Sequence, residues 1–164
     1  MINPTTKTSH SSPLSLKTLY ILLLLYSLFN STLAKSTTYN VVDFGAKPNG
    51  QTDSTKSFLI AWNKACTSTK PSTIYVPHRK FLLGRVTFRG ECTNKDISII
   101  IDGTLVAPSD YRVIGEESYW LTFENVSGVK IHGGVLDGKG TSLWDCKNSG
   151  KHCPLGAAVF CGYF

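Results

Sequence analysis

The sequence is poor in charge, in methionine and in long apolar runs. Only 17% of its 164 residues are charged and 41% are hydrophobic, a balance that excludes both a disordered charged tail and a multi-span membrane protein. The net charge is +6, but no run of Lys and Arg is longer than two, which argues against a nucleic-acid-binding stripe. The length is that of a single domain.

Acidic residues are absent from the first 34 positions, where two lysines precede an apolar run at residues 19–29. Eleven residues suit the core of a signal peptide, whereas a membrane span needs about 20. Small residues at Thr32 and Ala34 predict cleavage after Ala34, so that residues 1–34 form a signal peptide and residues 35–164 the mature chain. An uncleaved anchor is the alternative. We therefore expect a secreted, extracellular protein with no membrane contact after cleavage.

The sequence has five cysteines, and secretion makes them disulfide candidates before metal ligands. Cys146 and Cys153 enclose a short loop and are expected to pair locally. Cys66 and Cys92 are the natural second pair, which leaves Cys161 as the odd one. A single histidine beside Cys153 lacks the spacing of a zinc site, and we expect neither a metal nor a cofactor.

One segment of the mature chain has a clear helical periodicity. Its apolar residues, between positions 55 and 66, recur at spacings of three and four, and Asp53 or Ser54 can cap its first turn. Trp62 lies on the apolar face, where we expect it to pack rather than to serve as a sugar platform. The β-branched and aromatic residues 39–44 predict a strand before this helix.

From residue 73 onward we expect no helix, because short apolar runs are punctuated by Gly, Pro, Asn or Asp. The runs lie at residues 73–76, 81–83, 86–88, 97–101, 104–107, 120–123, 129–131 and 135–136. A hairpin sandwich is one interpretation. Stacked parallel coils are favoured by a weak repeat, in which Gly103 and Leu105 match Gly134 and Leu136 at an offset of 31 residues. A solenoid needs capped ends, and the predicted helix is placed to cap the first coil.

Three stretches of the mature chain stand out together: VVDFGAKPNGQTDSTKSFLIAWNKAC (Val41–Cys66), IYVPHRKFLLGRVTFRGEC (residues 74–92) and LTFENVSGVKIHGGVLDGKGTSLWDCKNSGKHCPLGA (residues 121–157). They resemble one family, the secreted polygalacturonases of plants, which are pectin-degrading glycoside hydrolases. The third is the most specific, because LDGKG is followed by LW-x-C and GK-x-CP-x-GA. The resemblance implies an all-β fold: a right-handed parallel β-helix, here its first coils only, with an N-terminal capping α-helix.

The resemblance also implies inverting hydrolysis of α-1,4-galacturonan by well-separated carboxylates. In this family the site is built from Asn-Thr-Asp, Asp-Asp, Gly-His-Gly and Arg-Ile-Lys motifs, and none of the four is present here. The nearest imitations begin at Gln51, Val129 and Ile131, and the one pair of adjacent acids is Glu116-Glu117. No catalytic residue is therefore assigned. We expect a truncated N-terminal portion that is inactive alone.

The expected partner is pectic polysaccharide, homogalacturonan, bound by a monomer, with no nucleic acid. One alternative is a non-catalytic remnant that binds the cell wall. Another is the N-terminal part of a different β-helix enzyme acting on polysaccharides, such as a calcium-dependent lyase, although the sequence shows no acidic calcium cluster.

Two polar features carry further hypotheses. Asn125 begins an Asn-Val-Ser sequon and is a candidate for glycosylation, the alternative being a turn asparagine that is hydrogen-bonded within its coil. The densest stretch of basic residues could bind pectate. Side chains along a strand alternate between its two faces, however, so we expect these residues to be divided between the faces and prefer the interpretation that they form a solvated surface. Its members are His78, Arg79, Lys80, Arg85 and Arg89.

Overall fold

The structure, a computed structural model, describes residues 15–29, 36–114, 116, 119–156 and 158–163, and the chain divides into two units, Met1–Leu33 and Ala34–Phe164. In the first unit, helix α1 (Leu16–Phe29) contains the apolar run predicted to be a signal core, and its described apolar side chains are exposed. Within the described residues, no helix is both long and apolar enough to cross a membrane. The predicted cleavage position lies outside the described residues, so the signal peptide stays a prediction.

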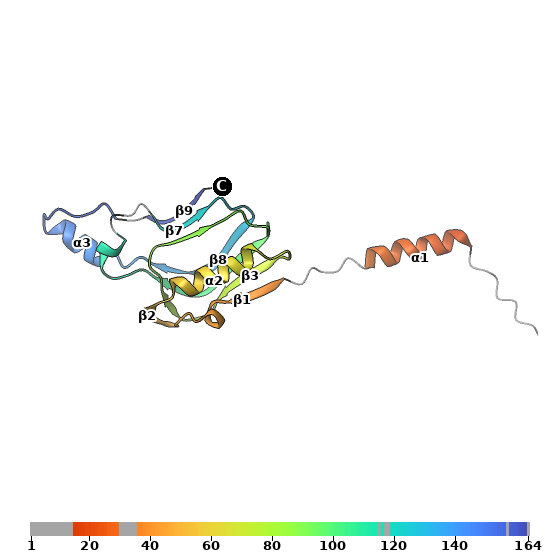
Figure 1. The fold of residues 1–164 in the computed structure, drawn as a ribbon, viewed down its shortest axis with the longest axis horizontal. Coiled ribbons are helices and arrows are strands. Elements are labelled where there is room, and N and C mark those ends of the chain that lie inside the picture. Colours follow the sequence, from red (N-terminus) through yellow and green to blue (C-terminus); the bar gives the residue numbers. More distant parts are fainter. Residues whose placement is uncertain (1–14, 30–35, 115, 117–118, 157, 164) are drawn as a thin grey trace, which may run out of the picture. The chain divides into compact units, whose positions relative to one another are not determined.

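The second unit is a partial parallel β-helix with three sides (Figure 1). Its first side stacks β1 (Thr37–Asn40), β3 (Ser72–Val76) and the first halves of β6 (Ile97–Val106) and β8 (Val129–Asp137). Every pairing on this side is parallel, and each successive strand in the order β1, β3, β6 and β8 belongs to the coil after that of the strand before it. Long crossovers between neighbouring strands are what a solenoid requires.

The second and third sides complete each coil. The second side stacks β2 (Asn49–Asp53), β4 (Lys80–Leu82) and the second halves of β6 and β8, which bend from the first side. The third side stacks β5 (Val86–Arg89), β7 (Tyr119–Glu124) and β9 (Ala158–Tyr163), again in parallel. The predicted parallel β-helix is confirmed, and the hairpin sandwich is excluded.

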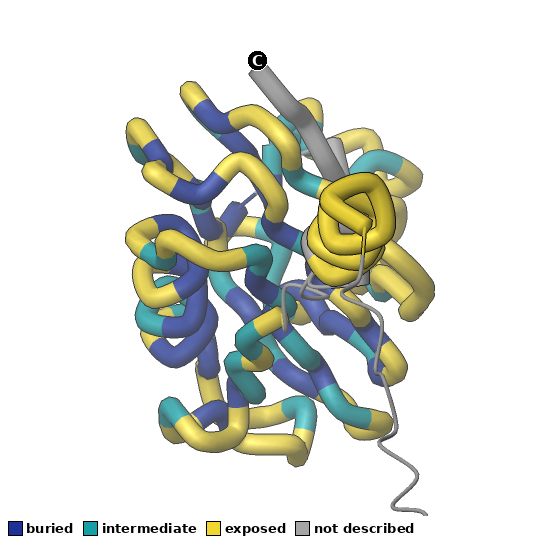
Figure 2. Tube along the Cα trace, turned by 90° about the vertical axis from the view of Figure 1, so that its right-hand side faces the viewer, coloured by how far each residue is buried: buried dark blue, intermediate teal, exposed yellow. Residues whose placement is uncertain are grey.

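Buried residues alternate with more exposed ones along β3, β5 and most of β6, and the colours of the tube in Figure 2 follow this burial. Ile74 and Ile99 are buried, occupy equivalent positions of successive coils, and are followed by Ile131 in the third. Leu105 pairs with Leu136, which confirms the repeat at an offset of 31 residues. These ladders of like residues form the core.

Helix α2 (Thr55–Cys66) has the bounds that the sequence predicts, and it lies against β1, β3 and β5. Its Trp62 is 1% exposed and donates its indole N–H to the Arg89 carbonyl at 3.1 Å. The same ring packs against Phe88 and Phe123 at centroid distances of 5.3 and 5.6 Å. Trp62 is therefore a packing residue, as predicted, and α2 caps the first coil.

Two predictions about local structure are wrong. Val41–Phe44 form the 3-10 helix η1 instead of a strand, because the Asn40 side chain accepts from Val42 N–H and Gly45 ends the turn at φ 94°. A helix also follows residue 73: α3 (Thr141–Asn148) is eight residues long. Such a short helix shows little periodicity in sequence and is held by tertiary bonds. A second 3-10 helix, η2 (Tyr111–Val113), lies between β6 and β7.

Both predicted disulfides form in the structure. Cys66, the last residue of α2, is bonded to Cys92 before β6, with a Cα–Cα distance of 4.6 Å. Cys146 in α3 is bonded to Cys153, with a Cα–Cα distance of 6.2 Å. Cys161 lies in β9, where its backbone pairs with that of Thr122 in β7. The side chain of Cys161 is not among the parts that the structure describes.

Candidate functional site

Three hollows adjoin one another around the second side of the β-helix. The first, which we call the basic hollow, has a volume of about 350 Å³. Its lining residues are Pro48, Asn49, His78, Arg79, Lys80, Gly103 and Thr104. The three basic side chains come from the turn between β3 and the first residue of β4, where strand alternation does not apply.

The predicted splitting of the basic stretch is thus wrong for His78, Arg79 and Lys80, which share one hollow. It is right for Arg89, which lies at the end of β5 and bonds Glu124 with its Nε at 2.6 Å. The bend of β6 passes directly beneath the turn that carries the three side chains. A methyl group on Gly103 would come within 2.4 Å of the carbonyl oxygens of Pro77 and Arg79, so only glycine fits there.

The middle hollow, of about 370 Å³, adjoins the basic hollow along β2, β4 and β6. Lys139 borders it from the loop after β8 and forms an ion pair with Asp137 at 3.0 Å. The hydrogen bond from Lys139 is the main reason that the pKa of Asp137 is lowered, and the nearby charge of Lys80 acts in the same direction. This part of the surface is therefore charged but locally balanced.

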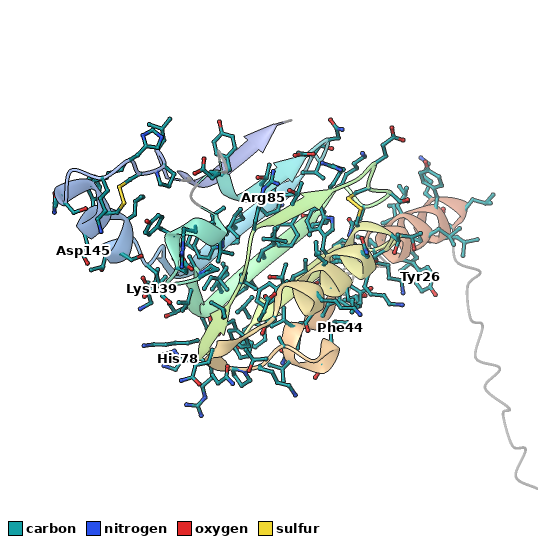
Figure 3. The ribbon with its side chains drawn as sticks, turned by 60° about the vertical axis from the view of Figure 1, so that its left-hand side comes forward. Tyr26, Phe44, His78, Arg85, Lys139 and Asp145 are labelled. Atoms are coloured by element: carbon teal, nitrogen blue, oxygen red, sulfur yellow. A yellow bond between two sulfur atoms is a disulfide. The ribbon has the colours of Figure 1, made fainter. Side chains whose placement is uncertain are left out.

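The third hollow, the α3 pocket, has a volume of about 480 Å³ and shares Pro108 and Lys139 with the middle one. Trp144 and Lys147 of α3 line it, and the Lys147 ammonium lies 5.1 Å from the centroid of the Trp144 ring. Trp144 is 61% exposed, whereas Trp62 and Trp120 are each 1% exposed. In Figure 3, Lys139, His78 and Asp145 of α3 lie along one edge of the second unit.

Side-chain bonds fix the walls of the α3 pocket. Ser142 Oγ donates to the Ser109 carbonyl at 2.7 Å, and the Tyr111 hydroxyl donates to Cys146 Sγ at 3.4 Å. Lys147 Nζ donates to the Leu155 carbonyl at 2.9 Å. These bonds tie α3 to the segment after β6 and to the loop closed by its disulfide. The pocket is therefore largely preformed.

Three carboxyl groups among the described residues have a lowered pKa. Burial alone would raise the pKa of Asp53, but hydrogen bonds from Thr55 and Gly84 outweigh it and hold the pKa below its usual value. The hydrogen bond from Arg112 lowers the pKa of Asp110. A general acid in glycoside hydrolysis needs a raised pKa, and each resolved shift of a described carboxyl is downward.

The partial motif matches, to which no catalytic role was assigned, lie on different strands or outside the described residues. His132 is exposed on β8, while Gln51 and Asp53 lie in β2, near the start of the β-helix. Glu116 is exposed, and Glu117 lies outside the described residues. Among the residues that are described, no three His, Cys, Asp or Glu side chains gather as metal ligands would.

Asn125 lies in the turn between β7 and β8, exposed and in the left-handed region with φ 54°. Val126, the middle residue of the sequon, is buried at 3% exposure, whereas Ser127 is exposed. The asparagine is thus presented to solvent, which favours the glycosylation hypothesis over the buried-turn alternative. Glycosylation itself stays a prediction.

A family comparison identifies the chain. The model of the glycosyl hydrolases family 28 matches residues 66–157, more than half of the chain, and this range includes the α3 pocket. The chain belongs to glycosyl hydrolases family 28. Within this family it is 55% identical over 133 residues to a polygalacturonase of Prunus persica, a match that covers 80% of the chain and 34% of that relative.

Two further relatives have a lower identity to the chain. A polygalacturonase of Gossypium hirsutum is 36% identical, and the match covers 79% of the chain and 32% of that relative. An exopolygalacturonase of Zea mays is 38% identical, and the match covers 68% of the chain and 27% of that relative. The chain spans about a third of the length of the curated relatives it matches. A crystal structure from Parabacteroides merdae, named for the glycosyl hydrolases, shares the fold with a TM-score of 0.55 and 18% identity, over 77% of this chain and 58% of that one.

The α3 pocket was not predicted from the sequence. Its residues Trp144 and Lys147 lie within residues 121–157, the stretch that resembles the family most specifically. The available signal was the pair Trp144 and Lys147, three positions apart beside a cysteine. On a helix, that spacing places both side chains on one face. Because no helix was predicted there, the two residues were not connected.

Proposed function

We propose that this chain is the N-terminal part of a polygalacturonase and that its described surface binds polygalacturonan, the polymer of pectin. The observation that carries the proposal is the 55% identity, over 80% of the chain, to a protein named polygalacturonase. The three adjoining hollows support it, because a polysaccharide needs an extended surface. Lysine and arginine side chains suit a polymer that carries a carboxylate on each sugar.

We further propose that these 164 residues bind polygalacturonan without hydrolysing it. The four catalytic motifs expected from the family resemblance are absent from the sequence. Inverting hydrolysis needs two carboxyl groups about 6.5–9.5 Å apart, one of them with a raised pKa. The downward pKa shifts of Asp53, Asp110 and Asp137 do not provide that acid.

A paired assay tests this proposal. The purified chain is incubated with polygalacturonic acid, new reducing ends are measured, and binding is followed in parallel by a pull-down on the insoluble polymer. We expect retention on the polymer and no increase in reducing ends. Turnover would overthrow the second proposal and leave the first intact, whereas failure to bind would overthrow the first.

Secretion belongs to the same proposal. The apolar residues of α1 and the small residues before Lys35 support a signal peptide and a cell-wall location. N-terminal sequencing of the protein recovered from the medium of expressing cells is expected to begin at Lys35. A secreted protein that retains Met1 would refute the cleavage.

A further inference from the structure

The α3 pocket contains the one tryptophan among the chain's three that the polypeptide does not bury. Trp62 and Trp120 each donate the indole N–H to a backbone carbonyl of the core, at 3.1 Å. Trp144 is 61% exposed on a short helix. The indole of Trp144 is therefore available for contact with a ligand, unlike the other two.

The charge beside Trp144 identifies the chemistry of that partner. Among the ionisable side chains that line the pocket, Asp137 is paired with Lys139, which leaves the positive charge of Lys147 in excess. Its ammonium has three donors, and the bond to the Leu155 carbonyl uses one of them. The pocket thus offers an aromatic surface, which suits the C–H groups of a sugar ring, next to a cation, which suits a carboxylate.

We propose that the α3 pocket is a subsite for one uronate residue of the polysaccharide, with Trp144 contacting the sugar ring and Lys147 binding its carboxylate. This inference rests on the proposed binding of polygalacturonan and assigns a location to it. The volume of about 480 Å³ lies within the range of about 300–1,000 Å³ that is usual for ligand pockets. The walls are already tied together by the Cys146–Cys153 disulfide and by the Ser142 bond, so little ordering is needed on binding.

Titration of the full chain with trigalacturonate, and with its methyl ester, tests the subsite. Because Trp144 is the exposed indole, we expect its fluorescence to change on binding of the free acid, and the methyl ester to bind more weakly. Trp144→Ala is expected to raise Kd about tenfold and Trp144→Tyr about threefold or less, since tyrosine keeps an aromatic surface. Trp144→Tyr also separates loss of the platform from local unfolding of α3.

Lys147→Gln is expected to raise Kd about fivefold for the free acid and to abolish the preference over the methyl ester. The matched control is Lys151→Gln, because Lys151 is exposed in the same disulfide loop but does not line the pocket. Unchanged affinity in both Trp144→Ala and Lys147→Gln would overturn the subsite while the proposed function stands. If trigalacturonate and polygalacturonan both fail to bind the unaltered chain, the proposed function fails as well.

Discussion

Gly103 is the residue on which the geometry of the basic hollow depends most directly. β6 leaves the first side of the β-helix and enters the second between Ile101 and Thr104, where the register with β8 shifts. A methyl group at Gly103 would lie 2.4 Å from two backbone oxygens and 2.9 Å from the backbone nitrogen of Arg79. Backbone atoms of the neighbouring coil cannot move aside as a flexible side chain can.

Gly103→Ala is therefore expected to lower the free energy of unfolding by about 3 kcal/mol, as overpacking does at rigid positions. Gly84→Ala is the matched control, since the nearest atom to its added methyl group is a Thr55 hydroxyl at 3.5 Å, an ordinary contact. We expect the control to change stability by about 0.5 kcal/mol or less. Urea denaturation of both variants measures the two changes in the free energy of unfolding. Equal decreases in the two variants would contradict the proposed clash at Gly103.

Asp137 is the residue at which pH should act on this side of the β-helix. The hydrogen bond from Lys139 lowers its pKa in the folded state. A lowered pKa contributes stability above the unfolded value of about 3.9, and this stability is lost as the pH falls through the folded value.

Asp137→Asn is accordingly expected to cost a few tenths of a kcal/mol at pH 7, because the ion pair is partly exposed and screened by water. The difference between the two proteins should shrink in concentrated salt and as the pH is lowered from 7 toward 2. Denaturation curves at the two pH values provide the measurement. A deficit that persists at the acidic pH would show that the charge of Asp137 is not its cause.

Among the elements, α2 and α3 are each tied down by one disulfide, but the two bonds close loops of very different length. Cys66 and Cys92 are 26 residues apart and join the capping helix to the coil that it covers. Cys146 and Cys153 are 7 residues apart and close the loop that carries the α3 pocket. The first disulfide therefore restrains the fold of the whole unit, whereas the second restrains only the loop that contains α3.

The entropy of loop closure sets the expected costs. Replacing Cys66 and Cys92 together by serine should cost about 3.5 kcal/mol, and replacing Cys146 and Cys153 about 2.4 kcal/mol. The second variant should also weaken binding of trigalacturonate, because the walls of the α3 pocket are released. Thermal unfolding of the two double variants gives the comparison, and a reversed order of stability would refute the assignment of roles.

For the whole molecule, the important feature is the outermost described coil on the first side. Ile131 and Leu136 occupy positions whose equivalents are buried in the preceding coil, yet both are 41% exposed. Among the described strands, β8 has β6 as its one neighbour, so its other edge carries unpaired backbone groups. An exposed apolar strand edge promotes association.

We expect the purified 164-residue chain to self-associate through this face at micromolar concentration. The monomer expected from the sequence stays a prediction, and the same measurement tests it. Ile131→Lys places a charge on the apolar face and should shift the population toward monomer. Val42→Lys, at another exposed apolar residue, is the control and should leave association unchanged. Analytical ultracentrifugation measures the effect, and a monodisperse monomer of the unaltered chain would refute it.

The sequence by itself determined the features that depend on neighbours along the chain. The periodicity of residues 55–66 predicted the bounds of α2, because an amphipathic face is a local property. The short spacing of Cys146 and Cys153 indicated their disulfide, and Cys66 and Cys92 followed as the natural second pair. The repeat that aligns Leu105 with Leu136 predicted the stacking of coils, because equivalent core positions carry like residues.

The tertiary structure alone decided which distant side chains share a surface. His78 and Arg79 lie in the turn before β4 and Lys80 is its first residue, so the three remain together, which the strand pattern did not reveal. Trp144 and Lys147 meet because residues 141–148 form a helix too short to be recognised by periodicity, held by bonds to Ser109 and Tyr111 from another coil. Contacts between coils have no local signature in sequence, and the candidate site consists of such contacts.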